Sequence, residues 1–413
     1  MRLLEPYRIL DLTDARGFLC GKLLADLGAD VVKIEPPGGD PSRQFPPYYL
    51  GVPHPERSLY WWAYNSNKRG VTLDLRSDKG RTLLHRFLSR ADILIESFDP
   101  GYLSGLGLGY PDLRRRYPGL IMVSITPFGQ TGPYAGYKTS DLVSMAMGGI
   151  VYVSGDPDRP PVRISYPQAY LHGGAEAAIG AMMAVLDRES TGKGQHVDVS
   201  IQESLVSTAV ASPVSWDITG EVQIRQGAIR SRGKGRVTYR LVWPCKDGYV
   251  VFTRIYGPGM NAAMGGMVAW VEAQGADAGA LAAVDWDTFD IDLLSQEDAE
   301  ALFDPLGRFF AQRTKAELFE VAVARRIPLY PVNTMEDLLK DRQLQARGLF
   351  HQVEHPELGV SLPYPVEYLK VHPEPIEIRR RAPLIGEHNL EIYQGELRLS
   401  LSEIQALEAE GVL

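Results

Sequence analysis

Residues 7–39 read YRILDLTDARGFLCGKLLADLGADVVKIEPPGG, and this stretch decides the fold. Two short apolar runs, at residues 7–12 and 30–34, flank a segment with helical periodicity at residues 21–27. A Pro-Pro-Gly-Gly turn then closes the unit. Short apolar runs on both sides of an amphipathic helix are typical of a βαβ unit with parallel strands.

The same alternation continues along the chain. Further strands are expected at residues 70–75, 92–96, 120–125 and 195–201, with helices at 78–91 and 110–117. A helix rich in glycine and alanine lies within residues 167–204 and ends at the turn residues 190–194. We therefore predict an α/β fold, with a Rossmann-like parallel sheet that helices cover on both faces. Ligands of such sheets bind beyond the carboxyl ends of the strands, here at the loops 13–18, 35–43, 97–101 and 126–133.

The pattern changes after residue 205 and indicates two domains. Residues 206–240 are poorly periodic and are predicted to form a crossover linker, whereas residues 241–334 are predicted to form a smaller α+β domain. This domain would hold a strand pair at 239–244 and 248–252, a flexible loop at 256–259, and helices over roughly 260–345. Residues 1–205 and 335–413 together would form the large domain, with short strands within 348–378 and a helix at 401–410. The linker is basic through six residues that are either solvated or in contact with an anion: Arg225, Arg230, Arg232, Lys234, Arg236 and Arg240.

Composition excludes several function classes. The 413 residues carry 43 basic and 51 acidic side chains, a net charge of −8, which argues against a nucleic-acid partner. Two cysteines cannot form a disulfide framework, no apolar run approaches the length of a membrane span, and the N-terminus has no signal-like apolar stretch. We expect a cytoplasmic protein without a bound metal. No G-x-G-x-x-G or Walker-type loop is present, which argues against a dinucleotide or NTP site.

Several blocks together resemble the class III (CaiB/BaiF, formyl-CoA transferase-like) CoA-transferase family. In chain order they are RILDLT, LADLGADVVKIEPPGGDPSR, NSNKRGVTLDL, ADILIESFDPGYLSGLGLGY, ITPFGQTGPYAGYKTSDL, TGKGQHVDVSIQES, DLLKDRQLQARGLF and APLIGEHN. The resemblance implies a large domain built from both termini, a small domain between them, and an interlocked dimer. It also implies that an aspartate attacks an acyl-CoA thioester and that CoA then passes to an acceptor carboxylic acid.

The chain departs from this family at the nucleophile. The family aspartate precedes the glycine that opens an A-x-x-G helix, and counting back from Gly174 gives Tyr170. A phenol has a pKa near about 10 and no carbonyl carbon, so it cannot carry an anhydride or thioester intermediate.

Other residues near this position are weighed as substitutes. Glu176 would point to a different helix face, and Asp141 corresponds to a structural aspartate that would act as a cap or ion-pair partner. Glu203 follows the last predicted strand and is likewise interpreted as a structural residue and not as a nucleophile. His172 is either a core histidine or a hydrogen-bond donor to a substrate carboxylate.

The resemblance also implies a CoA site. Its residues in this chain would be Arg16, Arg43, Asn67, Lys68, Arg69, Ser97 and Phe98. The polar run at residues 65–69 is interpreted either as a solvated turn or as a phosphate clamp. Asp99 and Gly105 stand where the family commonly has arginine, and Asp99 is expected to repel a diphosphate. The aromatic residues Tyr48, Tyr49, Trp61 and Trp62 would belong either to an acyl pocket or to the core.

Three functional interpretations remain open. The chain is one subunit of a heteromeric transferase whose homologous partner supplies the aspartate, as in the succinyl-CoA:(R)-benzylsuccinate type that the PQAYLHGGAEAA block resembles. Alternatively it is an active homodimer with another nucleophile, or a CoA-binding protein without catalysis. An α-methylacyl-CoA racemase is disfavoured because Ser140 and Tyr170 occupy its acid and base positions, and Cys20 is interpreted as a packing residue.

Overall fold

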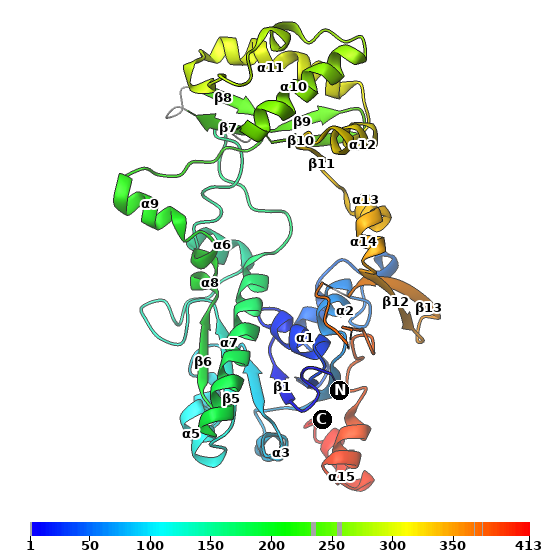
Figure 1. Ribbon diagram of the computed structural model, residues 1–413. Coiled ribbons are helices and arrows are strands. Elements are labelled where there is room, and N and C mark those ends of the chain that lie inside the picture. Colours follow the sequence, from blue (N-terminus) through cyan, green and yellow to red (C-terminus); the bar gives the residue numbers. More distant parts are fainter. Residues whose placement is uncertain (1, 233–236, 254–257, 367, 374) are drawn as a thin grey trace. The chain divides into compact units, whose positions relative to one another are not determined.

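The computed structural model describes residues 2–232, 237–253, 258–366, 368–373 and 375–413 (Figure 1). The chain forms two compact units. The first comprises Met1–Val151, Ile164–Glu221 and Arg342–Leu413, and the second comprises Tyr152–Arg163 and Val222–Asp341.

A six-stranded parallel sheet forms the centre of the first unit, in the order β3-β2-β1-β4-β5-β6. The strands are β1 (Arg8–Leu12), β2 (Asp30–Glu35), β3 (Arg69–Thr72), β4 (Ile93–Glu96), β5 (Ile121–Thr126) and β6 (His196–Ser200). The α/β fold with a parallel sheet is thus confirmed. The strand order reverses between β1 and β4, and this reversal makes a crevice at the carboxyl edge of the sheet.

Alternate residues of the strands enter separate cores on the two faces of the sheet. On one face Leu10, Val32 and Leu94 pack with α3 (Asp78–Leu88), α5 (Tyr110–Arg116) and α15 (Leu401–Ala409). On the other face Ile9 and Val31 pack with α1 (Phe18–Asp26) and α7 (Ala169–Thr191). Burial on both faces explains why these strands appear in the sequence as nearly continuous apolar runs.

Small residues let α7 pack closely. A Cβ atom on Gly173 would lie 2.8 Å from Cγ1 of Ile201, and one on Gly174 would lie 2.9 Å from Cβ of Leu19. Gly192 ends the helix in the left-handed region at φ +69°. Among the described residues α7 is also the one helix long and apolar enough, by length and composition, to cross a membrane. Its alanine and glycine face is buried in the core.

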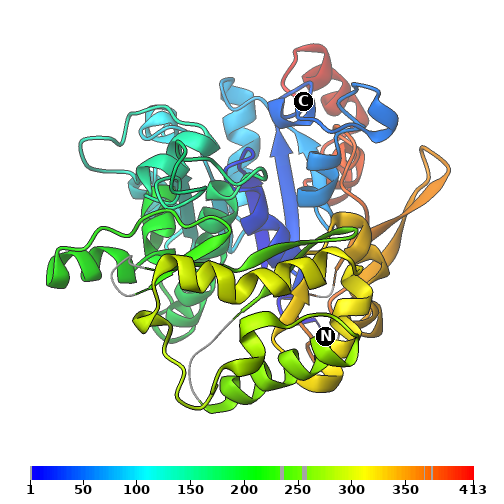
Figure 2. The ribbon, with the colours of Figure 1, turned by 90° about the horizontal axis from the view of Figure 1, so that it is seen from above.

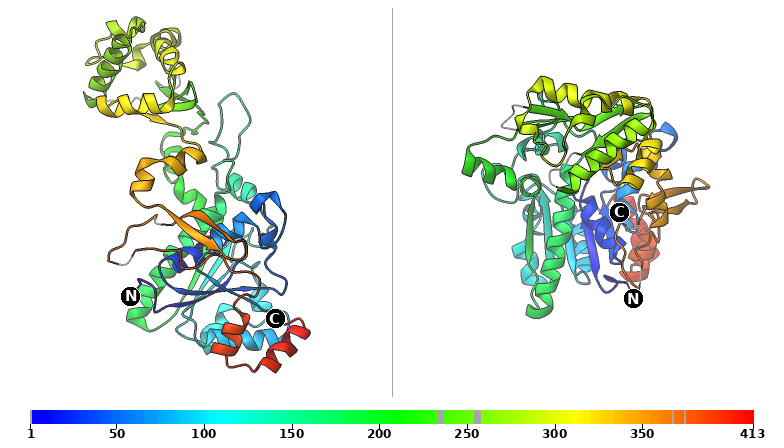
Figure 3. Two further views of the ribbon diagram at one scale, coloured as in Figure 1. Left: turned by 90° about the vertical axis from the view of Figure 1, so that its right-hand side faces the viewer. Right: turned by 45° about the horizontal axis from the view of Figure 1, so that its top comes forward.

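The end of the chain returns to the first strands. The hairpin of β12 (Phe350–His355) and β13 (Val360–Pro365) is drawn in orange in Figure 3. Its Val353 and Tyr364 belong to the same apolar core as Trp62 of α2 (Leu59–Asn65). Beyond it, the amide N–H of Asp74 donates to the carbonyl of Val412 at 2.8 Å. The red C-terminal segment accordingly lies beside the blue N-terminal strands in Figure 2.

The remaining helices of this unit are short. They are α4 (Tyr102–Gly105), α6 (Asp141–Met147), α8 (Ile201–Thr208), α9 (Ala211–Thr219) and α14 (Arg342–Ala346). Helix α9 corrects the expectation of an irregular crossover from residue 206. Val214, Trp216 and Ile218 of α9 are exposed within the chain.

The second unit has its own core. Two hairpin strands, β7 (Ile229–Arg232) and β8 (Val237–Arg240), are followed by a three-stranded sheet of β9 (Val242–Cys245), β10 (Gly248–Phe252) and β11 (Leu329–Pro331). Its helices are α10 (Pro258–Ala273), α11 (Gln296–Ala311), α12 (Lys315–Arg325) and α13 (Met335–Lys340). The expected pairing of β9 with β10 is confirmed, but Tyr239 belongs to β8.

Two sequence expectations for this unit fall partly outside the described residues. Of the loop predicted at 256–259, residues 256 and 257 lie outside them, and Pro258 already begins α10. Lys234 and Arg236 of the basic segment also lie outside them.

Candidate active site

A cavity of about 380 Å³ lies at the carboxyl edge of β1, β2, β3 and β4. Its volume falls within the range of small-molecule sites. The residues that line it are Leu12, Asp14, Arg16, Ile34, Glu35, Pro36, Asp40, Pro41, Leu73, Asp74, Leu75, Arg76, Ser97, Phe98 and Tyr102. Three of the seven predicted CoA residues, Arg16, Ser97 and Phe98, are among them.

The cavity wall that follows β3 was not expected from the sequence. The strand was expected to continue to residue 75, but β3 ends at Thr72, opposite Glu35 at the end of β2. Leu73 to Arg76 therefore form a loop at the carboxyl edge and line the cavity. The rule that ligands bind at strand ends would have found this loop if the strand end had been placed correctly.

Asp14 and Arg16 form a fixed pair in the loop after β1. The guanidinium of Arg16 donates to both carboxylate oxygens of Asp14, at 2.8 to 3.0 Å. The Ser97 hydroxyl donates to Asp14 Oδ1 at 2.9 Å and accepts from the Asp14 amide at 2.8 Å. The loops that follow β1 and β4 are thus joined at the switch point of the sheet.

Phe98 forms the aromatic side of the cavity. Its ring stacks on Tyr102 with the centroids 4.7 Å apart. The Phe98 amide donates to Glu96 Oε2 at 2.7 Å, and the Glu96 side chain is almost completely buried. Burial raises the pKa of Glu96 to about 7, although hydrogen bonds from Ser124 and Phe98 oppose this rise.

Lys68 lies inside the unit, away from the cavity wall. Its ammonium group is fully buried and donates to Asp11 Oδ2 at 2.8 Å, Asn65 Oδ1 at 2.9 Å and the Phe18 carbonyl at 3.0 Å. Burial lowers the pKa of Lys68, and Asp11 opposes this effect. Burial alone would raise the pKa of Asp11, but the ammonium groups of Lys68 and Lys33 bring it below its usual value. All three donors of Lys68 are satisfied within the protein.

Arg43 is likewise buried and paired. Its guanidinium donates to both oxygens of Glu35 at 2.7 and 2.8 Å, to Glu56 at 2.7 Å and to the Pro383 carbonyl at 2.9 Å. It also lies 3.7 Å from the centroid of the Trp61 ring. Trp61 and Trp62 are core residues, and Tyr49 packs on Trp62. Tyr48 is bound through its hydroxyl to the Gln44 carbonyl.

Asn67 and Arg69 connect distant parts of the chain. Asn67 adopts φ +66°, and its side-chain amide donates to Asp26 and to the Glu377 carbonyl, both at 2.8 Å. Arg69 pairs with Asp30, Glu391 and Glu396. The phosphate role expected for Arg43, Asn67, Lys68 and Arg69 stays a prediction, and their present partners are all protein groups.

Tyr170 lies in the first turn of α7 and packs at the edge of two apolar cores. Burial raises the pKa of Tyr170 to about 12, with a further rise from Asp14 that Arg16 partly offsets. Within the described part of the chain its hydroxyl has no hydrogen-bond partner. At a pKa of about 12 the phenol is protonated at neutral pH.

The other candidate residues weighed beside Tyr170 are three acids and one histidine. Asp141 Oδ1 accepts from the amides of Gln168 and Ala169 at 2.9 and 2.8 Å, which confirms its prediction as a cap. Glu176 is exposed on α7, and Glu203 stands in the first turn of α8. His172 is half-buried on α7.

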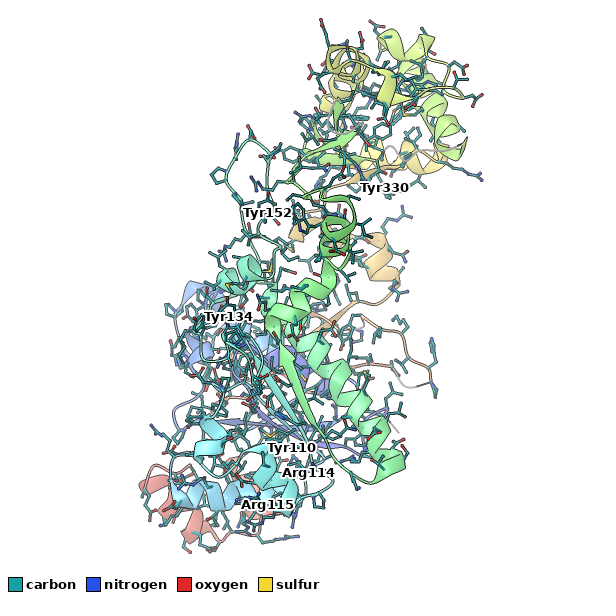
Figure 4. All side chains as sticks on the ribbon, turned by 90° about the vertical axis from the view of Figure 1, so that its left-hand side faces the viewer. Tyr110, Arg114, Arg115, Tyr134, Tyr152 and Tyr330 are labelled. Atoms are coloured by element: carbon teal, nitrogen blue, oxygen red, sulfur yellow. The ribbon has the colours of Figure 1, made fainter. Side chains whose placement is uncertain are left out.

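Asp99 has partners that sequence analysis did not anticipate. Its carboxylate binds the ammonium group of Lys138 and lies 3.8 Å from the guanidinium of Arg16. Lys138 comes from the loop after β5 that also carries Tyr134, which is labelled in Figure 4. These two cations lower the pKa of Asp99, with Lys138 the larger influence. Across the described residues, no three His, Cys, Asp or Glu side chains gather as a metal ion would require.

A cavity at the switch point of a doubly covered parallel sheet is typical of α/β proteins that hold a small-molecule ligand beyond their strand ends. The model of CoA-transferase family III matches residues 4–389. The chain belongs to this family, as its sequence blocks indicate.

Two relatives and one solved structure extend this result. The chain is 36% identical over 393 residues to the succinyl-CoA:(R)-benzylsuccinate CoA-transferase subunit BbsE of Thauera aromatica, a match that covers 94% of this chain and 92% of the relative. It is 31% identical over 425 residues to the succinyl-CoA–D-citramalate CoA-transferase of Chloroflexus aurantiacus, covering 100% of this chain and 98% of the relative. A CaiB/BaiF family protein from Brucella suis is similar in structure, with a TM-score of 0.81, 28% identity and coverage of 95% and 99%.

Proposed function

We propose that this chain is the non-nucleophilic subunit of a class III CoA-transferase, and that a homologous partner subunit supplies the catalytic aspartate. The observation that carries the proposal is Tyr170 in the first turn of α7, where the family resemblance puts the nucleophile. Its pKa of about 12 keeps the phenol neutral, and a phenol offers no carboxyl group to accept an acyl group.

The two carboxylates that raise the pKa of Tyr170 are already engaged. Asp141 holds the amides that begin α7, and Asp14 is held by Arg16 and Ser97. A carboxylate bound by several donors is a weaker nucleophile, because its charge is stabilised in place. Recruiting either acid would break these bonds, so neither is suited to replace the missing aspartate.

Dimerisation is supported by exposed apolar side chains. Ile179, Met183 and Leu186 of α7 are 55%, 68% and 70% exposed, and their spacing puts them on one helix face. Trp216 and Ile218 of α9 are 57% and 76% exposed. An apolar surface of this kind is covered in the functional state. We propose that a homologous subunit covers it in an interlocked dimer.

The cavity is proposed to hold the nucleotide end of CoA. Phe98 and Tyr102 offer a stacked aromatic surface for a base, and Arg16 and Arg76 are the cations of the wall. The buried Arg43 and Lys68 would act indirectly, by fixing the loops around the cavity. Arg43 does so through Glu35, and Lys68 through Asp11, the residue before Leu12 at the end of β1.

The reaction would proceed on the partner's aspartate. This carboxylate attacks the thioester carbonyl of the donor, the C–S bond breaks, and a mixed anhydride and CoA thiolate form. The thiolate then attacks the aspartyl carbonyl and releases the donor acid, leaving an aspartyl-CoA thioester. The acceptor carboxylate reverses these steps and leaves as its CoA thioester. Backbone N–H groups would stabilise the oxyanions.

The relatives suggest the substrates. Two of them are named for succinyl-CoA as donor, and their acceptors are benzylsuccinate and citramalate. We therefore propose succinyl-CoA as donor and a substituted dicarboxylic acid as acceptor.

The test compares this chain alone with this chain co-expressed with a homologue that carries the aspartate. Succinyl-CoA and benzylsuccinate are supplied, and the new CoA thioester is measured by liquid chromatography. Activity of the mixed assembly, absent from this chain alone and from an assembly whose partner has Asp→Asn, supports the proposal. Turnover by the purified chain alone would contradict it.

A further inference from the structure

The rim of the cavity carries an unusual arrangement of charge. Asp99 follows Phe98 in the loop after β4, and its carboxylate binds Lys138 and lies 3.8 Å from Arg16. Arg16 is held at the same time by both oxygens of Asp14. Each cation beside the rim thus faces a carboxylate of the same chain.

The charged side chains of the cavity wall are likewise paired. They are Asp14, Glu35, Asp40 and Asp74 against Arg16 and Arg76, and the buried Arg43 and Lys33 lie beside Glu35 and Asp40. Arg76 is paired with Asp74 at 2.8 Å, so its charge is also shared with a neighbour. An anionic ligand that enters would compete with Asp14 and Asp99 for Arg16, whereas Arg76, with 77% of its side chain exposed, stays accessible.

We propose that Asp99 is a specificity-determining residue that competes with anionic ligands for Arg16 and Lys138 and so weakens nucleotide diphosphate binding in this subunit's own cavity. This inference rests on the proposed function, in which that cavity receives the nucleotide end of CoA. Asp99 would act in two ways: it pairs with Arg16 and Lys138, and its own negative charge repels phosphate. The mixed assembly would then load CoA preferentially at the partner's site.

Stabilisation of the fold is a poor explanation for these pairs. The side chains of Asp99 and Lys138 are 55% and 80% exposed. Exposed ion pairs add little to stability, because solvent and salt screen them. Replacement of Asp99 by an isosteric amide should therefore leave the protein folded.

The experiment measures CoA binding to the purified chain by titration calorimetry. Asp99→Asn should bind CoA about tenfold more tightly than wild type, equivalent to about 1.4 kcal/mol. Its affinity should also fall more steeply with salt, because two freed cations become available to phosphate. Addition of Lys138→Met to Asp99→Asn should remove most of the gain. Glu5→Gln is the matched control, because this exposed acid precedes β1 at the opposite edge of the sheet.

Three results would overturn the inference: unchanged or weaker binding by Asp99→Asn, an equal gain with Glu5→Gln, or no binding by either protein. The proposed function is tested separately by turnover of the mixed assembly. If that assembly is active and Asp99→Asn binds CoA no better, only the inference about Asp99 fails. If Asp99→Asn gains affinity and no assembly turns over, only the proposed function fails.

Discussion

Replacement of Lys68 by methionine separates a structural role from a ligand-binding role. The substitution keeps the chain length and removes an ammonium group that makes three hydrogen bonds with no solvent contact. Asp11, also fully buried, would keep Lys33 at 3.7 Å and the hydroxyl of Thr13. Loss of one partner from a buried ion pair costs about 3 to 5 kcal/mol. Since Lys33 remains, we expect the lower end, about 3 kcal/mol.

Urea unfolding followed by tryptophan fluorescence measures this loss, because Trp61 and Trp62 lie in the core of the first unit. Lys340→Met is the matched control, since it breaks an exposed pair with Glu336 in α13 and should leave the midpoint almost unchanged. CoA affinity is measured on both variants under native conditions. If Lys68→Met is as stable as wild type but no longer binds CoA, the structural role is refuted. Lys68 is then again expected to bind phosphate.

Three further predictions concern single groups near the site. Tyr170→Phe should change turnover of the mixed assembly by less than about threefold; a loss beyond about a hundredfold, near 2.7 kcal/mol, would mean that the phenol takes part in catalysis. The pKa of Glu96 is raised from 4.5 in the unfolded chain to about 7 in the folded protein. The protonated carboxyl therefore stabilises the folded state fully below pH 4.5, and this stabilisation is lost as the pH rises through about 7. The unfolding free energy of Glu96→Gln, measured relative to wild type, should thus rise by about 2 to 3 kcal/mol between pH 5 and pH 8, and a pH-independent difference would show that the carboxyl titrates normally. Asp141→Ala should lower the unfolding free energy by about 1 kcal/mol through the lost cap on α7, with Asp141→Asn recovering most of it; equal stability of all three proteins would exclude the cap.

The sheet was predictable from the sequence because its signals are local. Each strand is a short apolar run, and amphipathic helices such as α3 alternate with the strands, so the α/β class and its strands follow directly. Strand ends were less predictable, as β3 illustrates, because they depend on where the neighbouring strand stops. Helix α9 was not expected from the sequence, although Val214 and Ile218 have helical spacing; both side chains are exposed in the structure.

The charged residues were harder to assign. Lys68 is a basic residue in a polar run, and only the pairing of strands shows that Asp11, 57 residues away, neutralises it. Asp99 and Lys138 are 39 residues apart and meet only because their loops leave adjacent strands. In contrast, Asp141 was expected to be a cap or ion-pair residue because the family resemblance has a structural aspartate at this position, and it caps α7 from the first turn of α6.

The most direct test of a nucleophile supplied in trans is to locate the covalent intermediate. The mixed assembly is incubated with succinyl-CoA, quenched with hydroxylamine or borohydride, and digested for mass spectrometry of both chains. We predict a modified aspartate on the partner subunit and none on this chain. A modified carboxylate in this chain, at Asp14, Asp141, Glu176 or any other acid, would contradict the proposal.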